Sequence, residues 1–276
     1  MIKSLQDTIT LHNGVEMPMF GLGVWQVEDG NEVIHSVKSA IKAGYKAIDT
    51  AAIYRNEVGV GTAIKESGVA REDLFITTKV WNAHQGYETT LDALDKSLQK
   101  LDLDYVDLYL IHWPVAGKYK DTWRALEKIY RDGKARAIGV SNFHIHHLED
   151  LIEDGEIIPM VNQIELHPLL SQLELRDYCA TKGIKVEAYS PLGSGKLLKH
   201  PALQNIADKH DKTIAQIILR WDLQQDIITI PKSIHESLII ENANIFDFVL
   251  SEEDMRIINA LNVNERFGAD PDSFNF

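Results

Sequence analysis

The feature that most constrains the fold of this sequence is a regular alternation of short apolar runs with longer stretches of helical periodicity. The short runs are typical of strands and lie at Phe20–Gly23, Lys46–Asp49, Leu74–Lys79, Val106–His112, Ala137–Val140, Val161–Glu165, Lys185–Tyr189 and Ile227–Ile230. Alternation of this kind, with no break in composition, indicates parallel strands joined by crossover helices. Eight such units in 276 residues favour a closed (β/α)8 barrel, and we expect one domain over residues 1–276.

The intervening stretches have the spacing of amphipathic helices. Leu91, Leu94, Leu98 and Leu101 recur at steps of three and four residues, which places them on one helix face. The N-terminal segment differs, because an Asn13-Gly14 turn separates two short runs and therefore predicts a β-hairpin.

A doubly wound open sheet is the structural alternative. Its dinucleotide-binding signature is G-x-G-x-x-G after the first strand. Gly21 and Gly23 supply the first two glycines, but Gln26 stands where the third belongs. A lone G-x-G is weak evidence, so the sequence favours the barrel.

Charge and cysteine content limit the class of function. The net charge of −13 argues against nucleic acid or an anionic membrane as the main partner, since both select basic surfaces. The single cysteine, Cys179, excludes an internal disulfide framework and fits a reducing cytoplasm, where we expect the protein to act. No apolar run approaches the ~20 residues that a membrane span needs.

Titratable residues gather at the ends of three consecutive predicted strands. Asp49 ends the second strand and Tyr54 lies in the loop after it, while Lys79 and His112 end the third and fourth. Because active groups of a barrel come from the C-terminal strand ends, these four side chains are expected to converge. A tyrosine holds its proton at neutral pH, and a nearby ammonium makes it a better acid. With Asp49 as counter-charge to Lys79 and His112 orienting a substrate oxygen, the set suits reduction of a carbonyl by a hydride from elsewhere.

Each residue also fits a structural role when it is taken singly. Asp49 fits a turn cap, Tyr54 a rim aromatic, Lys79 a solvated strand end and His112 a hydrogen-bonded core histidine. The joint pattern favours the catalytic interpretation, because each of three strands in a row contributes one member.

The chain resembles the aldo-keto reductase family over nearly its whole length, from about residue 9 to about residue 261. The motifs that carry the resemblance are GVEMPMFGLGVW, AIDTAAIYRNEVGVG, FITTKVW, DLYLIHWP, IGVSNF, VNQIELHP, YSPLGSG and TIPKS, in family order. They place Asp49, Tyr54, Lys79 and His112 on the family's catalytic residues. The pattern is most similar to the bacterial branch of 2,5-diketogluconate and methylglyoxal reductases.

This resemblance implies a (β/α)8 barrel with an N-terminal hairpin closing the bottom and two extra helices. It also implies NADPH-dependent reduction of small aldehydes, ketones and dicarbonyls, such as methylglyoxal or keto sugars, to alcohols. The hydride would come from nicotinamide C4 and the proton from Tyr54. We expect a monomer, because a closed barrel leaves no open strand edge.

The resemblance further implies which residues hold the cofactor. These are Val24, Trp25, Asp49, Ser141, Asn142, Gln163, Tyr189, Ser190, Leu192, Ser194, Lys232, Ser233, Glu241 and Asn242. Two of these segments also fit structural roles, since Ser141-Asn142 can cap a helix and Pro231-Lys232-Ser233 is typical of a surface turn. One departure matters: Leu238 stands where the family usually has an arginine. A weaker preference for NADPH over NADH follows, because no guanidinium grips the 2′-phosphate.

The substrate site is expected to combine Tyr54 and His112 with the tryptophans Trp25, Trp81 and Trp113, which follow strand ends. Core packing is the alternative for these tryptophans. The C-terminal tail contains Phe267, Phe274 and Phe276, for which two positions stay open: over the mouth of the pocket or against the side of the barrel.

Three clustered histidines, His144, His146 and His147, raise the question of a metal ion. His-x-His spacing on a helix points two ligands apart, and no further ligand accompanies them in sequence, so no metal site is predicted. Two other functions stay open for the chain as a whole. One is a nicotinamide-binding sensor like the potassium-channel β subunits, and the other is a structural protein like the lens crystallins of this fold.

Overall fold

The computed structural model describes residues 2–276, and its centre is a sheet of eight parallel strands. Hydrogen bonding joins the strands in chain order. They are β3 (Gly21–Gly23), β4 (Ala47–Asp49), β5 (Phe75–Val80), β6 (Val106–Ile111), β7 (Ala135–Ser141), β8 (Val161–Glu165), β9 (Lys185–Tyr189) and β10 (Ile228–Thr229). The predicted (β/α)8 architecture is confirmed, and the predicted strand ends differ by at most two residues.

The first and last strands meet, so the sheet curls into a nearly closed barrel. Phe20 and Thr229 form a parallel bridge, and the backbone N–H of Thr229 donates to the Met19 carbonyl at 3.1 Å. At the other end of the contact, the N–H of Gly23 donates to the Pro231 carbonyl at 3.2 Å. The closing contact is short because β10 has two residues.

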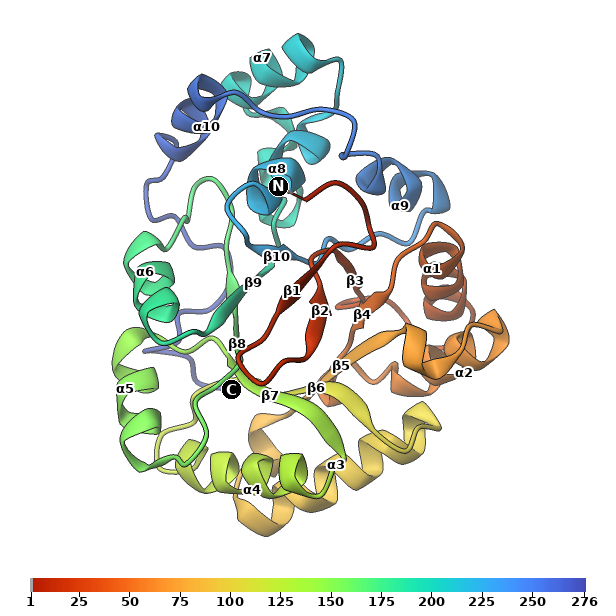
Figure 1. Ribbon diagram of the computed structural model, residues 1–276, viewed down its shortest axis with the longest axis vertical. Coiled ribbons are helices and arrows are strands. Elements are labelled where there is room, and N and C mark those ends of the chain that lie inside the picture. Colours follow the sequence, from red (N-terminus) through yellow and green to blue (C-terminus); the bar gives the residue numbers. More distant parts are fainter. Residues whose placement is uncertain (1) are drawn as a thin grey trace.

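The helices form an outer ring around the strands (Figure 1). They are α1 (Asn31–Lys42), α2 (Glu57–Ser67), α3 (Tyr87–Leu101), α4 (Tyr119–Arg131), α5 (Ile145–Asp154), α6 (Leu173–Thr181), α7 (Pro201–His210), α8 (Ile214–Leu223), α9 (Glu236–Ala243) and α10 (Glu252–Asn259). Helices α7 and α10 lie outside the repeated units and pack on each other, which matches the two extra helices. None of the helices among residues 2–276 has the length and apolar character required to cross a bilayer.

Helix α3 shows how the sequence pattern becomes packing. Leu94, Leu98 and Leu101 are buried against the barrel, and Leu91 is half-buried at the edge of the same face. The predicted apolar face is therefore the one that covers the strands.

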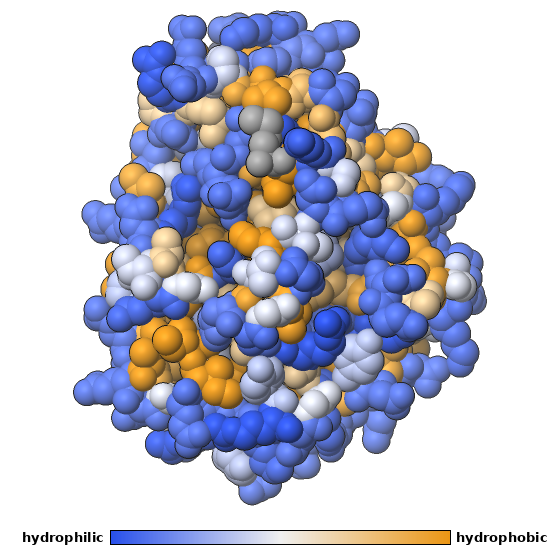
Figure 2. Space-filling view, viewed as in Figure 1, coloured by the Kyte–Doolittle hydropathy of each residue, from blue (hydrophilic) through white to orange (hydrophobic). Residues whose placement is uncertain are grey.

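The N-terminal hairpin covers the bottom of the barrel. Strands β1 (Thr8–Thr10) and β2 (Glu16–Pro18) pair antiparallel around a turn in which Gly14 has a φ of +87°. Leu11 and Met17 of the hairpin are buried, and so is Met19, which follows it. Figure 1 shows the hairpin lying across the middle of the strand ring, and Figure 2 shows hydrophilic residues over most of this face.

The two glycines of Gly21-Leu22-Gly23 have a packing function. A Cβ on Gly21 would lie 2.8 Å from the Ala47 Cβ, and one on Gly23 would lie 3.0 Å from the Ile230 carbonyl oxygen. Glycine at these positions lets β3 approach both of its neighbours. The G-x-G motif thus belongs to the strand and forms no nucleotide-binding turn.

Candidate active site

The four predicted catalytic residues come from adjacent elements at the C-terminal end of the barrel. Asp49 is the last residue of β4, Lys79 lies near the end of β5, and His112 directly follows β6. Tyr54 ends a short 3-10 helix, Ala52–Tyr54, in the loop after β4. Parallel strands carry these positions to one edge, so the side chains meet as the sequence predicts.

An ion pair lies at the centre of the site. The Lys79 Nζ donates to the Asp49 Oδ1 at 2.6 Å and to the Thr50 carbonyl at 2.9 Å. The same Nζ lies 3.5 Å from the Tyr54 hydroxyl. Lys79 is fully buried, so its charge requires the Asp49 carboxylate as a partner.

Burial and charge act in opposite directions on the two proton-carrying groups. Burial raises the pKa of Tyr54 above 10, and the Lys79 ammonium only partly offsets that effect. Burial lowers the pKa of Lys79, but the nearby charges, Asp49 foremost, bring it above its ordinary value. The Lys79 ammonium acts on Tyr54 in the expected direction, but the effect of burial is larger. Tyr54 therefore keeps its proton at neutral pH.

His112 is a neutral imidazole that faces the pocket. Burial, and then the charge of Lys79, hold the pKa of His112 well below 6.5. Its ring lies edge-on to Tyr54, with centroids 5.7 Å apart, and edge-on to Trp81 at 5.3 Å. Its buried Nδ1 has no hydrogen-bond partner within residues 2–276. A neutral ring beside Tyr54 is suited to hydrogen-bond a substrate oxygen.

A polar floor lies beneath these groups. The Gln163 Nε2 donates to the Asp49 Oδ2 and to the Glu187 Oε2, both at 2.8 Å. Burial, and then the charge of Asp49, raise the pKa of Glu187 to about 8, so Glu187 is mainly protonated at pH 7. Both amide hydrogens of Gln163 are thereby used, which leaves its oxygen as its remaining polar atom. Glu187 has no place in the sequence prediction; a buried carboxylate in mid-strand, two residues before Tyr189, was the available signal.

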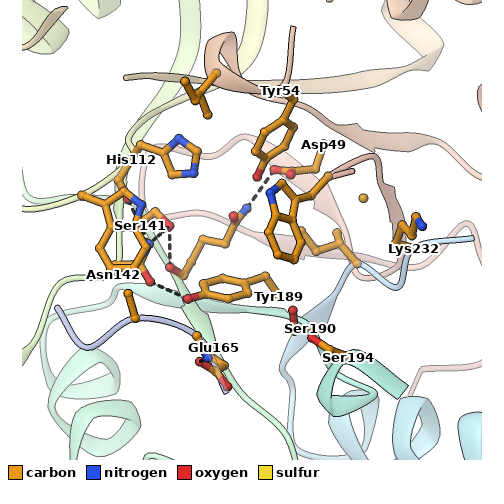
Figure 3. A pocket seen from close by; sticks show the side chains of 18 of the residues that line it. Asp49, Tyr54, His112, Ser141, Asn142, Glu165, Tyr189, Ser190, Ser194 and Lys232 are labelled. Carbon is orange, nitrogen blue, oxygen red and sulfur yellow. Dashed lines mark hydrogen bonds between the residues drawn. The ribbon is translucent and has the colours of Figure 1, made fainter. Parts of the chain in front are cut away.

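A cavity of about 410 Å³ opens above this floor (Figure 3). All the predicted substrate contacts line it: Trp25, Tyr54, Trp81, His112 and Trp113. Lys79 does not line the cavity and lies behind Asp49 and Tyr54. Of the predicted cofactor residues, the same cavity is lined by Trp25, Asp49, Ser141, Asn142, Gln163, Tyr189, Ser190, Ser194 and Lys232.

Hydrogen bonds fix the wall of the cavity opposite Tyr54. The Tyr189 hydroxyl donates to the Asn142 Oδ1 at 2.7 Å, as Figure 3 shows. The Asn142 Nδ2 donates to the His112 carbonyl at 3.0 Å, and the Ser141 hydroxyl donates to the Gln163 carbonyl at 2.8 Å. Asn142 holds a left-handed backbone with φ of +63°, which asparagine tolerates better than most residues. This wall is therefore rigid and polar on one side of an aromatic pocket.

A second cavity of about 620 Å³ adjoins the first and shares Trp25, Ser190, Ser194 and Lys232 with it. It is lined by the remaining predicted cofactor residues except one, namely Leu192, Ser233, Glu241 and Asn242. Val24 is the exception: it is fully buried and lines neither cavity, because it packs in the core just before the exposed Trp25. Leu238, which replaces the usual arginine, lines the second cavity and is 43% exposed.

Two further tail residues, Gly268 and Ala269, and the residue that anchors the tail have no place in the sequence prediction. Phe267, Gly268 and Ala269 line the first cavity. Glu165, the last residue of β8, accepts the backbone N–H of Phe267 at 2.7 Å and that of Gly268 at 2.9 Å. The available signal was an acid at a strand end, which requires hydrogen-bond partners once it is buried.

The end of the tail lies over the mouth of the cavity, which settles the position left open by the sequence. Phe276 stacks on Trp81 with centroids 5.8 Å apart and lies edge-on to Trp113 at 5.1 Å. Phe274 packs on Trp113 at 5.1 Å. The Asn82 Nδ2 donates to the Phe276 backbone oxygen at 3.0 Å.

Comparisons with known proteins agree with this geometry. The family model described as "Aldo/keto reductase family" matches residues 19–263. The glyoxal reductase of Bacillus subtilis (strain 168) is 67% identical over 276 residues, which cover all of both chains.

Two solved structures have the same fold over nearly their whole length. MGS-M4, an aldo-keto reductase enzyme from a Medee basin deep-sea metagenome library, has a TM-score of 0.95 at 47% identity, covering 98% of this chain and 100% of that one. A mutant of Gox0644 in complex with NADPH has a TM-score of 0.93 at 42% identity, covering 98% of each chain. Sequence, fold and site thus agree, and the chain belongs to the aldo/keto reductase family of oxidoreductases.

Proposed function

We propose that this protein reduces small aldehydes and dicarbonyls, such as glyoxal and methylglyoxal, to alcohols with NADPH, and that Tyr54 is the proton donor. The observation that carries the proposal is the buried chain from Asp49 through Lys79 to Tyr54, with its hydroxyl end at a cavity lined by tryptophans. The similarity to a glyoxal reductase supports the substrate class, and the relative that binds NADPH supports the cofactor.

The residues of the two adjoining cavities fit a dinucleotide. The first offers the Gln163 oxygen and the hydroxyl and amide side chains of Ser141 and Asn142, which suit a carboxamide. Tyr189 offers an aromatic face. In the second cavity, the exposed ammonium of Lys232 suits a phosphate. When bound, NADPH supplies the hydride.

The side chains of this protein would supply the proton and stabilise the negative charge that develops on the substrate oxygen. His112 and Tyr54 hold the carbonyl oxygen of the substrate, and Trp25, Trp81 and Trp113 exclude water around it. As negative charge develops on that oxygen, the Tyr54 hydroxyl transfers its proton, so that the carbonyl becomes an alcohol. The phenolate left behind lies beside the Lys79 ammonium, which stabilises it. Asp49 keeps that ammonium charged.

The proposal is tested by replacing Tyr54 with phenylalanine. Oxidation of NADPH is followed with glyoxal, methylglyoxal and glyceraldehyde as substrates. We expect kcat/KM to fall by about 100- to 10,000-fold, since a positioned proton donor contributes that much. NADPH binding, followed by fluorescence, should change by less than about threefold.

Tyr87→Phe is the matched control, because Tyr87 lies exposed on α3, where it lines neither cavity. Normal turnover by Tyr54→Phe would remove Tyr54 as the donor. Binding of NADPH with no turnover of any carbonyl by the unmodified protein would instead favour the sensor interpretation.

A further inference from the structure

Three histidines and one aspartate from distant parts of the chain meet beside the C-terminal tail. His144, His146 and His147 lie at the start of α5, and Asp272 lies in the tail, 128 residues after His144. The Asp272 carboxylate lies 2.9 Å from the His144 Nδ1, 3.1 Å from the His146 Nε2 and 3.7 Å from the His147 Nε2. One ligand atom from each residue lies within 4.8 Å of all the others.

The backbone explains why the histidines converge although the sequence predicts that they point apart. His144 is the N-cap of α5 and has an extended backbone, with φ of −79° and ψ of 172°. The His144-x-His146 spacing is therefore not a spacing within a helix, and both rings reach the same side. Asp272 supplies the fourth group that the local sequence lacks.

The hydrogen bonds assign different roles to the three rings. The His147 Nδ1 accepts the backbone N–H of His144 at 3.1 Å, so the neutral ring carries its proton on the Nε2, on the side of Asp272. His147 thus holds the helix start and faces the carboxylate with a donor. The His144 Nδ1, the His146 Nε2 and the Asp272 oxygens face one another as possible ligand atoms.

We propose that His144, His146 and Asp272 bind a divalent transition-metal ion of the Zn²⁺ type, with His147 as a positioning residue. Two imidazoles and a carboxylate are ligands that Zn²⁺ takes at 2.0–2.2 Å, and water completes such sites. The side chains of His146 and Asp272 are 61% and 50% exposed, so an ion can enter from solvent. The site lies outside both cavities and goes beyond the proposed carbonyl reduction.

One neighbouring group must adjust when the ion binds. The Arg266 Nη2 lies 3.5 Å from the His144 Nε2, which would carry the ring proton once the Nδ1 binds metal. Arg266 has a second partner, because its Nη1 lies 3.8 Å from the Glu165 Oε2. The guanidinium can therefore turn away from the ring and keep a carboxylate beside it.

The ion would join α5 to the tail. Asp272 lies two residues before Phe274 and four before Phe276, whose rings pack on Trp113 over the mouth of the cavity. A metal ion on Asp272 therefore restrains the segment that covers the substrate pocket.

The first experiment is a calorimetric titration of the full chain, without a histidine tag, with Zn²⁺ alone. We expect one ion per chain, and a loss of affinity of at least about 10-fold in His146→Ala and in Asp272→Asn. His35→Ala is the matched control, because His35 is an exposed histidine on α1 and should leave the affinity unchanged. Mg²⁺, which prefers oxygen ligands, should give no binding. No binding of Zn²⁺ up to about 1 mM, or unchanged affinity in both variants, would overturn the site.

A second experiment tests the restraint of the tail by hydrogen exchange. The Ser273 and Phe274 amides donate to the Asp270 carbonyl at 3.1 and 3.0 Å. Zn²⁺ should slow their exchange in the unmodified protein but not in His146→Ala, which lacks one of the proposed ligands. Binding of Zn²⁺ with unchanged exchange in the tail would refute the restraint while leaving the metal site in place.

Discussion

Among single side chains, Asp49 and Glu187 show how burial and charge determine which groups of the site carry a proton. Only one of the two carboxylates that share Gln163 is paired with an ammonium, and the other, Glu187, holds a proton instead. Two ionised carboxylates at this depth would be costly, because both are buried and share one amide group. The polar floor of the site thus combines the Asp49 carboxylate and the Lys79 ammonium with the neutral groups of Gln163 and Glu187.

Glu187 gives a prediction for stability. Its pKa of about 8 in the folded protein lies above its ordinary 4.5, so between these values the folded state binds more protons than the unfolded state. The contribution of Glu187 to stability is therefore full below about pH 4.5 and is lost as the pH rises through about 8. In Glu187→Gln, the free energy of unfolding relative to the unmodified protein should rise steadily from pH 5 to 8, measured by urea titration. Glu72→Gln, at an exposed site, should show no such trend, and a pH-independent difference for Glu187→Gln would contradict the assignment.

Leu238 gives a prediction for cofactor choice. In the absence of a guanidinium at this rim of the second cavity, we expect NADPH to be preferred over NADH by less than ~1000-fold in kcat/KM (roughly 4 kcal/mol). Leu238→Arg should raise the preference by about 10- to 100-fold, the effect of one or two charge-assisted hydrogen bonds to a phosphate. Leu238→Gln controls for polarity without charge. An unchanged ratio in the arginine variant would place the 2′-phosphate elsewhere.

At the level of elements, the close packing of α2 against the end of α3 depends on a glycine. A Cβ on Gly61 would lie 2.2 Å from the Leu101 carbonyl oxygen, which is backbone and cannot turn away. We expect Gly61→Ala to lower the free energy of unfolding by about 1–3 kcal/mol, as overpacking does, despite the better helix propensity of alanine. Val58→Ala, at a position 52% exposed on the same helix, should change it by less than about 0.5 kcal/mol. Equal stability of the two variants would show that the helices separate without cost.

The elements also show how far the sequence could predict this site. The strand ends were predictable because alternation and spacing are local, and they placed Asp49, Lys79 and His112 correctly. The tail was not, since the contact of Phe267 with Glu165 joins residues 102 positions apart and no local pattern encodes it. The raised pKa of Tyr54 was missed for a similar reason, because the depth of burial depends on all the surrounding elements.

For the molecule as a whole, we propose that residues 1–276 form a single domain that unfolds as one unit and acts as a monomer. The hairpin side chains are part of the same apolar cluster as the barrel strands, so the hairpin should not melt alone. Met17→Ala should destabilise the protein by about 2–5 kcal/mol and shift one single transition, followed by circular dichroism and by tryptophan fluorescence. Thr10→Ala, on the exposed side of the hairpin, serves as the control. Two separate transitions would contradict the single unit, and sedimentation tests the monomer.

The short meeting of β3 with β10 has a consequence for ligand binding. This junction is the shortest in the barrel, and both cavities lie across it, with Trp25 following β3 and Lys232 following β10. A dinucleotide that contacts residues on both sides would hold the two ends of the sheet together. Binding of the cofactor should therefore raise the melting temperature of the protein.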